Sequence, residues 1–273
     1  MDVSIIVVNF NTFEITCNCV SSIIENTFGV EYEIIIVDNG STESSPVSFQ
    51  HLFPTIQLIS SKGNIGFAKG NNLGIEKAQG KYILLLNSDT VLNSDAVSLC
   101  KNFLDNHSKV AVVTCLLEYP DGQIQHNCQR YPSARYKLFE LLRLQKVFGN
   151  KTGGRILLGS FFDYRSMVYA DWVWGTFFMF RKDLLSHFLN KRLADDFFMY
   201  GEDMQWCIDF RKLGYKIAFL PDASIVHLYG KSNGPKNDMM KKNIDSIMLK
   251  YYRWPHRIVI KTINFLLTKK YEY

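Results

Sequence analysis

The residues best suited to chemistry in this chain are carboxylates that follow strongly apolar stretches. Asp89 comes after Tyr82–Leu86, an apolar run without alternation that stops at the polar pair Asn87 and Ser88. A continuous apolar run bounded by turn signals is typical of a strand buried on both faces. Ligands of open α/β sheets bind at the carboxyl ends of the strands. We therefore predict that Asp89 lies at a binding edge, where it could hold a divalent metal ion and the metal a diphosphate.

Two further acids suit the same kind of site. Asp38 ends the apolar stretch Glu33–Val37, and Asp203 follows Glu202 at the start of a predicted helix. A carboxylate near a hydroxyl group can remove its proton as a general base. Each acid also has an ordinary structural alternative. Asp38 would form an Asx-turn, and Glu202 and Asp203 would complement the dipole of their helix.

A histidine and two tryptophans complete the set of candidates. His227 follows a short predicted strand, and its neutral imidazole could be a second metal ligand or a hydrogen-bonded core residue. Trp172 and Trp174 could stack on a sugar or could pack in the core. The sequence leaves both alternatives open.

The pattern of the first part of the chain predicts alternating strands and helices that would carry these side chains. Strands are predicted at Val3–Val8, Glu33–Val37, Ile56–Ser60, Lys81–Asn87 and Val110–Thr114, with helices at 13–26, 68–78 and 95–106. Asn11 or Thr12 and Ser94 are the expected N-caps. A strand, a helix and a strand within about forty residues imply a parallel βαβ unit. We therefore expect an α/β fold with a mostly parallel central sheet flanked by helices.

A loop rich in glycine and asparagine precedes the second predicted helix. It contains Asn64, Gly66 and Phe67, with Asn71 a turn further on. Glycine allows the backbone to approach a ligand closely. The N-terminal amides of the helix would face an anion. Alone, this loop is a weak signal, because Gly and Asn mark any turn.

The pattern is irregular from Leu116 to Ala170 and becomes regular again after it. There we predict a short helix at about 136–147, a helix at 202–213 and strands at 215–219 and 223–226. Gly230, Ser232 and Gly234 predict a small loop. The remainder, 235–273, is helical in pattern and basic, with Pro255 as an interruption.

Composition narrows the class of protein. A net charge of +5 over 273 residues is a mild excess, so we expect no nucleic-acid partner. The six cysteines show no CxxC pair and no zinc spacing, which predicts reduced thiols. Asp2 stands where a signal peptide would be basic, and no stretch reaches the ~18 apolar residues that span a bilayer. We therefore expect the protein to face the cytoplasm.

Five short motifs occur in a characteristic order: Val7-Val8-Asn9-Phe10-Asn11, Val37-Asp38-Asn39-Gly40-Ser41, Asn64-Ile65-Gly66-Phe67-Ala68-Lys69-Gly70-Asn71-Asn72, Leu86-Asn87-Ser88-Asp89 and Gly201-Glu202-Asp203. Together they resemble family 2 glycosyltransferases of the GT-A fold. The closest similarity is to the rhamnosyltransferase-like branch of bacterial polysaccharide assembly. The resemblance covers roughly residues 3–232.

The resemblance implies roles for residues that match these motifs. Asn9 and Asn11 match the first loop near the nucleotide, and Asp38 matches the acid that hydrogen-bonds the base. The loop that closes over base and ribose is matched by Asn64, Gly66, Phe67 and Asn71. Asp203 matches the general base, with Glu202 as its orienting neighbour. His227 matches a histidine that touches the metal or the diphosphate in some members.

The metal motif departs from the family pattern. The family has Asp-x-Asp where this chain has Asn87-Ser88-Asp89, which leaves Asp89 to hold Mg²⁺ or Mn²⁺. The resemblance implies inverting transfer from a nucleotide-diphosphate sugar to a saccharide or polyprenyl-linked acceptor. The donor would be dTDP-rhamnose, a UDP-hexose or a UDP-N-acetylhexosamine. Trp172 and Trp174 would lie on the acceptor side.

No sharp domain boundary is evident. We expect a nucleotide-sugar-binding half at 1–115, an acceptor-binding and catalytic half of the same domain at 116–234, and a helical extension at 235–273. The basic, aromatic end of the extension, 255–273, would lie on an anionic membrane surface, at the inner face of the cell membrane. A solvated appendage and a homodimer contact are the alternatives.

Two rival functions are weighed on the same residues. A nucleotidyltransferase acting on sugar phosphates normally has a basic, Gly-rich N-terminal loop, and here Asn9-Phe10-Asn11 contains no basic residue. A non-catalytic sugar-binding module would not need Asp38, Asp89 and Asp203 together. Both rivals are therefore less favoured than the transferase.

Overall fold

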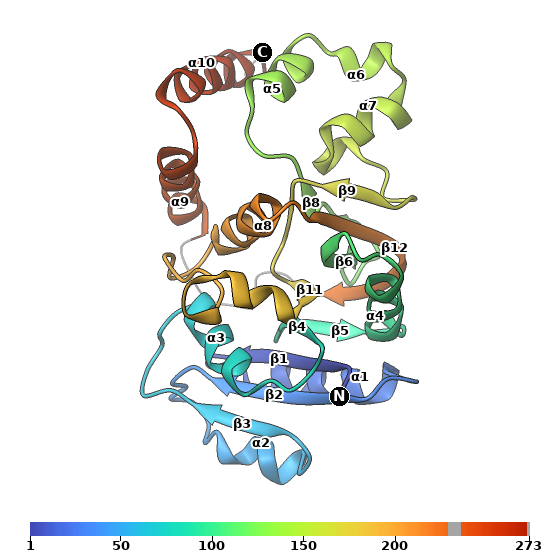
Figure 1. Cartoon of the computed structure of the whole chain (residues 1–273), viewed down its shortest axis with the longest axis vertical. Helices are drawn as coiled ribbons and strands as arrows, with labels where there is room; N and C mark the ends of the chain where they lie inside the picture. The colour runs from blue at the N-terminus through green and yellow to red at the C-terminus, as the bar shows by residue number, and fades with distance from the viewer. Residues whose placement is uncertain (229–235, 272–273) are drawn as a thin grey trace.

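The computed structural model describes residues 1–228 and 236–271, in which one twisted sheet runs through the molecule (Figure 1). Its strand order within these residues is β3-β2-β1-β4-β11-β6-β12-β5, with β7 paired to β6 and β9 paired to β12. Strands β1 to β4 pair in parallel, β11 is antiparallel to both β4 and β6, and β12 is parallel to β6. The predicted α/β fold with a mostly parallel sheet is confirmed.

The strands of this sheet are β1 (Val3–Asn9), β2 (Tyr32–Asp38), β3 (Gln57–Ser60), β4 (Tyr82–Asn87), β5 (Thr90–Leu92), β6 (Val110–Glu118), β7 (Ile124–Gln125), β9 (Val168–Ala170), β11 (Phe177–Arg181) and β12 (Lys216–His227). A separate antiparallel pair is formed by β8 (Cys128–Gln129) and β10 (Trp172–Val173).

The helices of the described residues are α1 (Phe13–Asn26), α2 (Val47–Leu52), α3 (Phe67–Lys77), α4 (Ala96–Asn106), α5 (Ala134–Leu141), α6 (Leu144–Val147), α7 (Asn150–Leu157), α8 (Glu202–Lys212), α9 (Lys236–Tyr251) and α10 (Trp254–Tyr271). Short 3-10 segments lie at Gly159–Phe161, Lys182–His187 and Leu189–Lys191.

Strand β4 is buried on both faces, as its unbroken apolar run predicted. Leu84 and Leu86 lie in one core cluster, with residues of α1 and α4, while Ile83 and Leu85 lie in a second cluster with residues of α3 and α8. Successive side chains of a strand point to opposite faces. Helices therefore cover both faces of the sheet, which is the reason that its central strands are apolar throughout.

Several local predictions need correction. The two strands expected at 215–219 and 223–226 are one strand, β12, with a register shift between Leu220 and Ser224. The helix expected at 136–147 is two helices, because Arg143 between them is left-handed with φ 52°. Strand β5 and helix α2 were not predicted.

The expected helix caps also differ from those observed. Asp95, not Ser94, caps α4 by accepting a hydrogen bond from the Ser98 amide (3.2 Å), while Ser94 donates to the Ser224 carbonyl on β12 (2.8 Å). Thr12 occupies the N-cap of α1 without a side-chain cap bond. Its hydroxyl is used elsewhere, in the site described below.

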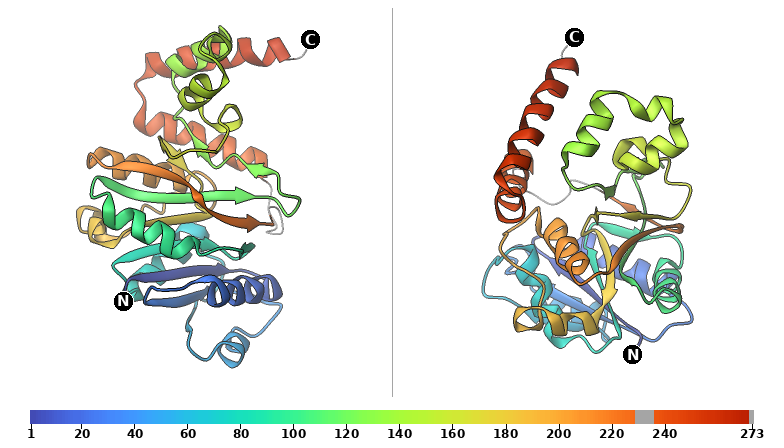
Figure 2. Two further views of the ribbon diagram at one scale, coloured as in Figure 1. Left: turned by 90° about the vertical axis from the view of Figure 1, so that its right-hand side faces the viewer. Right: turned by 45° about the horizontal axis from the view of Figure 1, so that its top comes forward.

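The segment after β6 and the C-terminal helices form a second layer above the sheet (Figure 2). Helix α10 packs against α5, and α5 and α6 pack against α7. The predicted division at 115 lies inside β6, so the two predicted halves share one sheet. The predicted boundary at 234 and the loop with Gly230, Ser232 and Gly234 lie outside the described residues. Pro255 lies in the first turn of α10, where proline is tolerated, and follows a break in the helical structure.

Two further findings concern composition. All six cysteines are buried and unpaired, as predicted. In the part of the chain that the structure describes, no helix is long and apolar enough to cross a membrane.

Candidate active site

Asp89 and His227 are brought together by strand pairing. Strand β5 pairs antiparallel with the end of β12, so that Thr90 faces His227, and the Leu228 amide donates to the Asp89 carbonyl (2.8 Å). Both side chains are buried, and His227 Nε2 lies 3.3 Å from Asp89 Oδ1. The contact depends on β5, which the sequence pattern did not reveal.

Gln125 on β7 fixes the orientation of the imidazole. Its Nε2 donates to the main-chain oxygen of His227 (2.7 Å), so its Oε1 is the atom 2.7 Å from His227 Nδ1. An acceptor at Nδ1 requires the proton on that nitrogen, and in the neutral ring the lone pair is then on Nε2. Nε2 and Asp89 Oδ1 therefore present electron pairs to each other. This arrangement is unfavourable unless a proton or a cation lies between the two atoms.

This arrangement fits a divalent cation. A metal-bound histidine characteristically donates its other N–H to an oxygen acceptor, as His227 does to Gln125. The pair supplies one oxygen and one nitrogen ligand. Within residues 1–228 and 236–271, no group of three or more His, Cys, Asp or Glu side chains gathers as a metal site. A metal held here would need oxygen ligands from a phosphate, which is the usual situation for Mg²⁺.

A chain of hydrogen bonds links Asp38 to the residue before Asp89. Asn9 Nδ2 donates to Asp38 Oδ1 (2.8 Å), and Asn9 Oδ1 accepts from the Thr12 hydroxyl (3.0 Å). The Thr12 hydroxyl lies 3.4 Å from that of Ser88. Asp38 Oδ2 also accepts from the Ser41 amide (3.1 Å), three residues on rather than the two of an Asx-turn. The structure thus brings Asn9, Asp38, Ser88 and Asp89 to one edge of the sheet.

Asn11 supports this edge from outside. It adopts a left-handed conformation with φ 53°, which asparagine tolerates better than most residues. Its side-chain oxygen accepts from the Thr42 amide (2.8 Å), and its own amide donates to the Ser41 hydroxyl (3.0 Å). Asn11 therefore ties the first loop to the turn that follows Asp38.

Asn39 organises the glycine-rich loop. It donates to Asn64 Oδ1 (3.0 Å) and accepts from the Ile65 amide (3.1 Å), while Asn64 Oδ1 also accepts from the Gly66 amide (3.0 Å). Asn39 was not among the predicted site residues, although it lies inside the second motif. The sequence signal that could have identified Asn39 was its position between Asp38 and a glycine.

Phe67 begins α3, but its amide does not face an open site. It donates to the Phe198 carbonyl (2.8 Å) in the loop before α8. The helix begins one residue earlier than predicted, and its Phe67 amide is already bonded; an anion at the amides from Ala68 on stays a prediction. The Phe67 ring lies 6.2 Å from that of Trp206, and the buried Asn71 donates to the Phe67 carbonyl (3.0 Å). Asn71 thus stabilises the first turn of its own helix.

Glu202 and Asp203 begin α8. Asp203 accepts from the Gly175 amide (3.3 Å) and from the Met204 amide (2.8 Å). Burial raises the pKa of Asp203 and also that of the neighbouring Glu202, for which the nearby Asp203 charge is a second cause. Glu202 is buried, and no described residue donates a hydrogen bond to its Oε2. Such raised pKa values are typical of acids that exchange protons.

Gly175 and Thr176 connect Asp203 to the end of β4. The Gly175 amide contacts Asp203, and the Thr176 carbonyl accepts from the Asn87 amide (3.0 Å). The contact with Asp203 and the contact with the segment that carries Asp89 are therefore made by adjacent residues. Long-range pairing between β11 and β4 creates this proximity.

The tryptophans lie on the same segment. The Trp172 indole donates to the Arg130 carbonyl (3.3 Å), and its ring packs beside a buried cluster that includes Met204 and Ile247. Trp174 is half-buried and packs against the core next to Gly175. The packing interpretation accounts for both, and their acceptor role remains a prediction.

Helix α9 holds the loop that leads to Asp203. Asn243 donates to the carbonyls of Met199 (2.9 Å) and Tyr200 (2.7 Å). Tyr200 and Gly201 have φ values of 66° and 99°, a left-handed pair that needs outside support. Asn243 was missed because its partners are main-chain atoms some forty residues away, for which the sequence holds no signal.

The protein family of this chain follows from its similarity to known proteins. Residues 4–188 match the family described as Glycosyl transferase family 2. The chain belongs to this family and is a glycosyltransferase, which confirms the resemblance found in its motifs. The rhamnosyltransferase-like branch stays a prediction.

Relatives of known description differ in length from this chain. It is 24% identical over 237 residues to the glycosyltransferase GlyG of Streptococcus pneumoniae, covering 85% of this chain and 71% of that protein. It is 34% identical over 142 residues to the chondroitin synthase of Pasteurella multocida, covering 50% of this chain and 14% of the synthase. The chain thus corresponds to a small part of the synthase.

Solved structures confirm the GT-A fold. The crystal structure of S. aureus TarS 1-349 is similar with a TM-score of 0.57 and 16% identity, over 83% of this chain and 60% of that one. The structure of GalNAc-T7 with UDP, GalNAc and Mn²⁺ gives a TM-score of 0.64 and 14% identity, over 91% and 48%. At these identities the likeness concerns the fold.

Proposed function

We propose that the protein transfers a sugar, with inversion, from a nucleotide-diphosphate sugar to a saccharide or lipid-linked saccharide in polysaccharide synthesis. The observation that carries the proposal is the buried contact of Asp89 with His227, whose ring orientation suits a metal ligand. Asp38 and Asp203 are tied to the same sheet edge by hydrogen bonds. The side of the site with Asp38 would bind the donor, and the side with Asp203 would activate the acceptor.

Asp89 and His227 would hold Mg²⁺ or Mn²⁺. When bound, the metal would neutralise charge on the diphosphate of the donor. A single carboxylate and a neutral imidazole suit Mn²⁺ at least as well as Mg²⁺, because Mg²⁺ prefers oxygen ligands. A neighbour of similar fold is described with Mn²⁺, which supports this choice.

Asp203 would act as the general base. Its carboxylate takes the proton of the acceptor hydroxyl, and the oxygen attacks the anomeric carbon of the donor. The bond from that carbon to the diphosphate oxygen breaks, and nucleoside diphosphate leaves with the electron pair. Attack opposite the leaving group inverts the configuration. A raised pKa suits this role, since it makes the carboxylate a stronger base near neutral pH.

The donor would lie over the first loop, with its base near Asp38 and its ribose under Asn64 to Phe67. UDP is favoured by the neighbour described with UDP and GalNAc, and dTDP-rhamnose by the motif resemblance. Relatives named chondroitin synthase and minor teichoic acid biosynthesis protein support a role in polysaccharide synthesis.

A thermal-shift experiment tests the donor site. UDP, dTDP and GDP are added to the full chain with Mn²⁺, with Mg²⁺ or with EDTA. A ligand at about 100 times its Kd stabilises by about 2.7 kcal/mol, so the matching nucleotide should raise Tm, and more with metal. Asp89→Asn should abolish the metal-dependent part, while the exposed control Asp222→Asn should not. Equal shifts in both variants would refute the metal site.

Helix α10 would place the enzyme on an anionic membrane surface at the inner face of the cell membrane. Trp254, Ile258 and Leu266 are exposed, and the basic Arg257 lies among them, with no acid between 253 and 267. An apolar face with basic flanks is typical of interfacial helices.

Sedimentation with anionic vesicles tests this contact. The double variant Ile258→Asp with Leu266→Asp should lose vesicle binding, whereas Leu189→Asp, at a side chain that is more exposed and lies outside α10, should keep it. Unchanged vesicle binding would remove the membrane role. A change in oligomeric state instead would assign the face to a homodimer.

A further inference from the structure

A cavity of about 430 Å³ lies outside the candidate active site, between α5 and α7. It is lined by Arg130, Arg135, Tyr136, Thr152, Arg155 and Ile156, so three arginines and no acidic residue line it. Arg135 and Arg130 both lie over the ring of Tyr136, at 4.5 Å and 5.6 Å from its centroid to their central carbons. Like charges gathered around one hollow repel each other unless an anion joins them.

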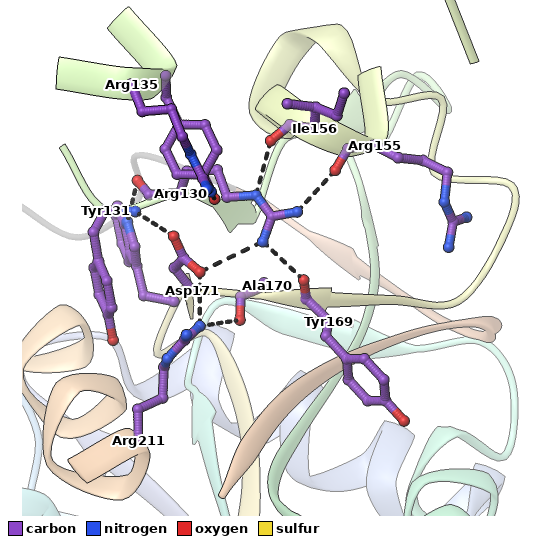
Figure 3. A network of polar contacts seen from close by, with 11 residues as sticks. Arg130, Tyr131, Arg135, Arg155, Ile156, Tyr169, Ala170, Asp171 and Arg211 are labelled. Carbon is purple, nitrogen blue, oxygen red and sulfur yellow. Dashed lines mark hydrogen bonds and ion pairs between the residues drawn. The ribbon is translucent and has the colours of Figure 1, made fainter. Parts of the chain in front are cut away.

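Arg130 is held rigidly by the surrounding main chain (Figure 3). It donates to the carbonyls of Ile156 (2.9 Å), Arg155 (2.8 Å) and Tyr169 (3.0 Å), and to Asp171 Oδ1 (3.4 Å). This one side chain therefore joins α7 to β9. Arg130 is therefore a positive charge in a fixed position between α7 and β9, rather than a mobile surface arginine.

Asp171 does not neutralise the cavity. Its Oδ1 is also the partner of Arg211, at 2.7 Å, and its Oδ2 accepts from the Tyr131 amide (3.0 Å) (Figure 3). One carboxylate is thus shared by two guanidinium groups. Of the three lining arginines, only Arg130 contacts a carboxylate among the described residues, and that carboxylate is already compensated.

The other two arginines differ in freedom. Arg155 is half-buried and donates to the Ser166 hydroxyl and to the Met167 carbonyl (3.0 Å). Arg135 is exposed at the start of α5 and donates to the Tyr136 hydroxyl (2.6 Å). Arg135 is therefore the residue best able to reach an incoming ligand without rearranging the fold.

From these observations we propose that this cavity binds a phosphate-bearing anion, most favourably a diphosphate group. The planar guanidinium fork matches phosphate oxygens in a bidentate manner. The guanidinium groups of Arg130 and Arg135, gathered over Tyr136, suit a ligand with more than one negative charge better than a single carboxylate. The proposal concerns anion binding and holds whether or not the proposed sugar transfer is right.

Isothermal titration of the full chain with inorganic pyrophosphate in EDTA tests the site. EDTA removes the metal on which binding at Asp89 would depend. Arg135→Gln should weaken pyrophosphate binding about tenfold, because a charge-assisted hydrogen bond is lost. Arg143→Gln is the matched control: it removes the same charge from an exposed position in the same helical layer, outside the cavity lining, and should leave binding within about twofold.

A second arm distinguishes the source of the phosphate. Neutral vesicles, with and without a lipid bearing a phosphate monoester head group, are sedimented with the same variants. Selective loss in Arg135→Gln in either arm supports the proposal and identifies the source as soluble or lipid-borne. Equal loss in both variants would mean unspecific charge attraction. That result, or no loss at all in both arms, would overturn the proposal.

The variants also separate this site from the proposed active site. Arg135→Gln should leave the metal-dependent nucleotide shift unchanged, and Asp89→Asn should leave pyrophosphate binding in EDTA unchanged. Arg130 is avoided as a test position because its loss would remove four contacts that hold α7 and β9 together.

Discussion

At the first edge of the sheet, Asn9 donates to Asp38 and Asn39 donates to Asn64, whereas at the start of α8 the buried Glu202 has a carboxylate oxygen without a described donor. The first region is built from amide side chains that satisfy each other. The second buries two adjacent acids and raises the pKa of both. Satisfied networks favour a fixed binding surface. Buried acids instead favour proton exchange, which fits the division into donor binding and base catalysis proposed above.

Asp203→Asn should have the largest effect of the variants that test this difference between the two regions. Loss of a general base typically costs 10²–10⁴-fold in rate, so kcat for sugar transfer should fall by about that factor. Nucleotide binding, which belongs to the other region, should change little. Steady-state kinetics and nucleotide titration measure both quantities. Asp209→Asn, on the same helix, is the control, and full activity in Asp203→Asn would place the base elsewhere.

Gly40→Ala tests how tightly the donor-side region is built. A Cβ at Gly40, where φ is 77°, would lie 2.3 Å from Gly63 Cα, so two backbones would have to separate. We expect a loss of about 3 kcal/mol in the free energy of unfolding, measured by urea titration.

Gly122→Ala is the matched control for Gly40→Ala, at a glycine outside the donor-side region. It has φ 82° but nothing within 4 Å of the new Cβ, so the loss should be only about 1 kcal/mol, for the backbone conformation alone. Equal losses would show that the close approach of Gly40 and Gly63 does not matter for stability.

Asn243→Asp tests whether α9 positions the catalytic turn. The new carboxylate would face the carbonyls of Met199 and Tyr200, where the amide now donates to both. We expect kcat to fall about tenfold, by loss of one to two hydrogen bonds, with unchanged nucleotide affinity. Ser246→Ala, whose hydroxyl bonds within its own helix, is the control. An unchanged kcat would limit α9 to a structural role.

The pH dependence of stability gives a separate test of the buried acids. Burial raises the pKa of Glu202 from its ordinary 4.5 to about 8. Between these values the folded state binds more protons than the unfolded chain, so the free energy of unfolding should fall as pH rises from about 4.5 to about 8. Glu202→Gln should flatten that slope, and the exposed Glu43→Gln should not. A slope unaffected by Glu202→Gln would mean that Glu202 ionises normally.

Sequence patterns were reliable where one segment determines its own structure. The run Tyr82–Leu86 has no polar face, so it can only be a strand buried on both sides or a buried helix, and its length and turn signals favour the strand. The family motifs likewise lie within single segments. For this reason the sheet, the family and the edge that carries Asp38 and Asp89 were predicted correctly.

Tertiary structure alone decided the contacts between distant segments. The pairing of β5 with β12 puts His227 beside Asp89, Gln125 arrives from an irregular segment to orient the imidazole, and Asn243 reaches main-chain carbonyls. Hydrogen bonds to backbone groups do not depend on the partner's side chain, so they leave no trace in the sequence pattern. Burial, which raises the pKa of Glu202 and Asp203, is likewise a property of the assembled core and not of two adjacent acids in a helix.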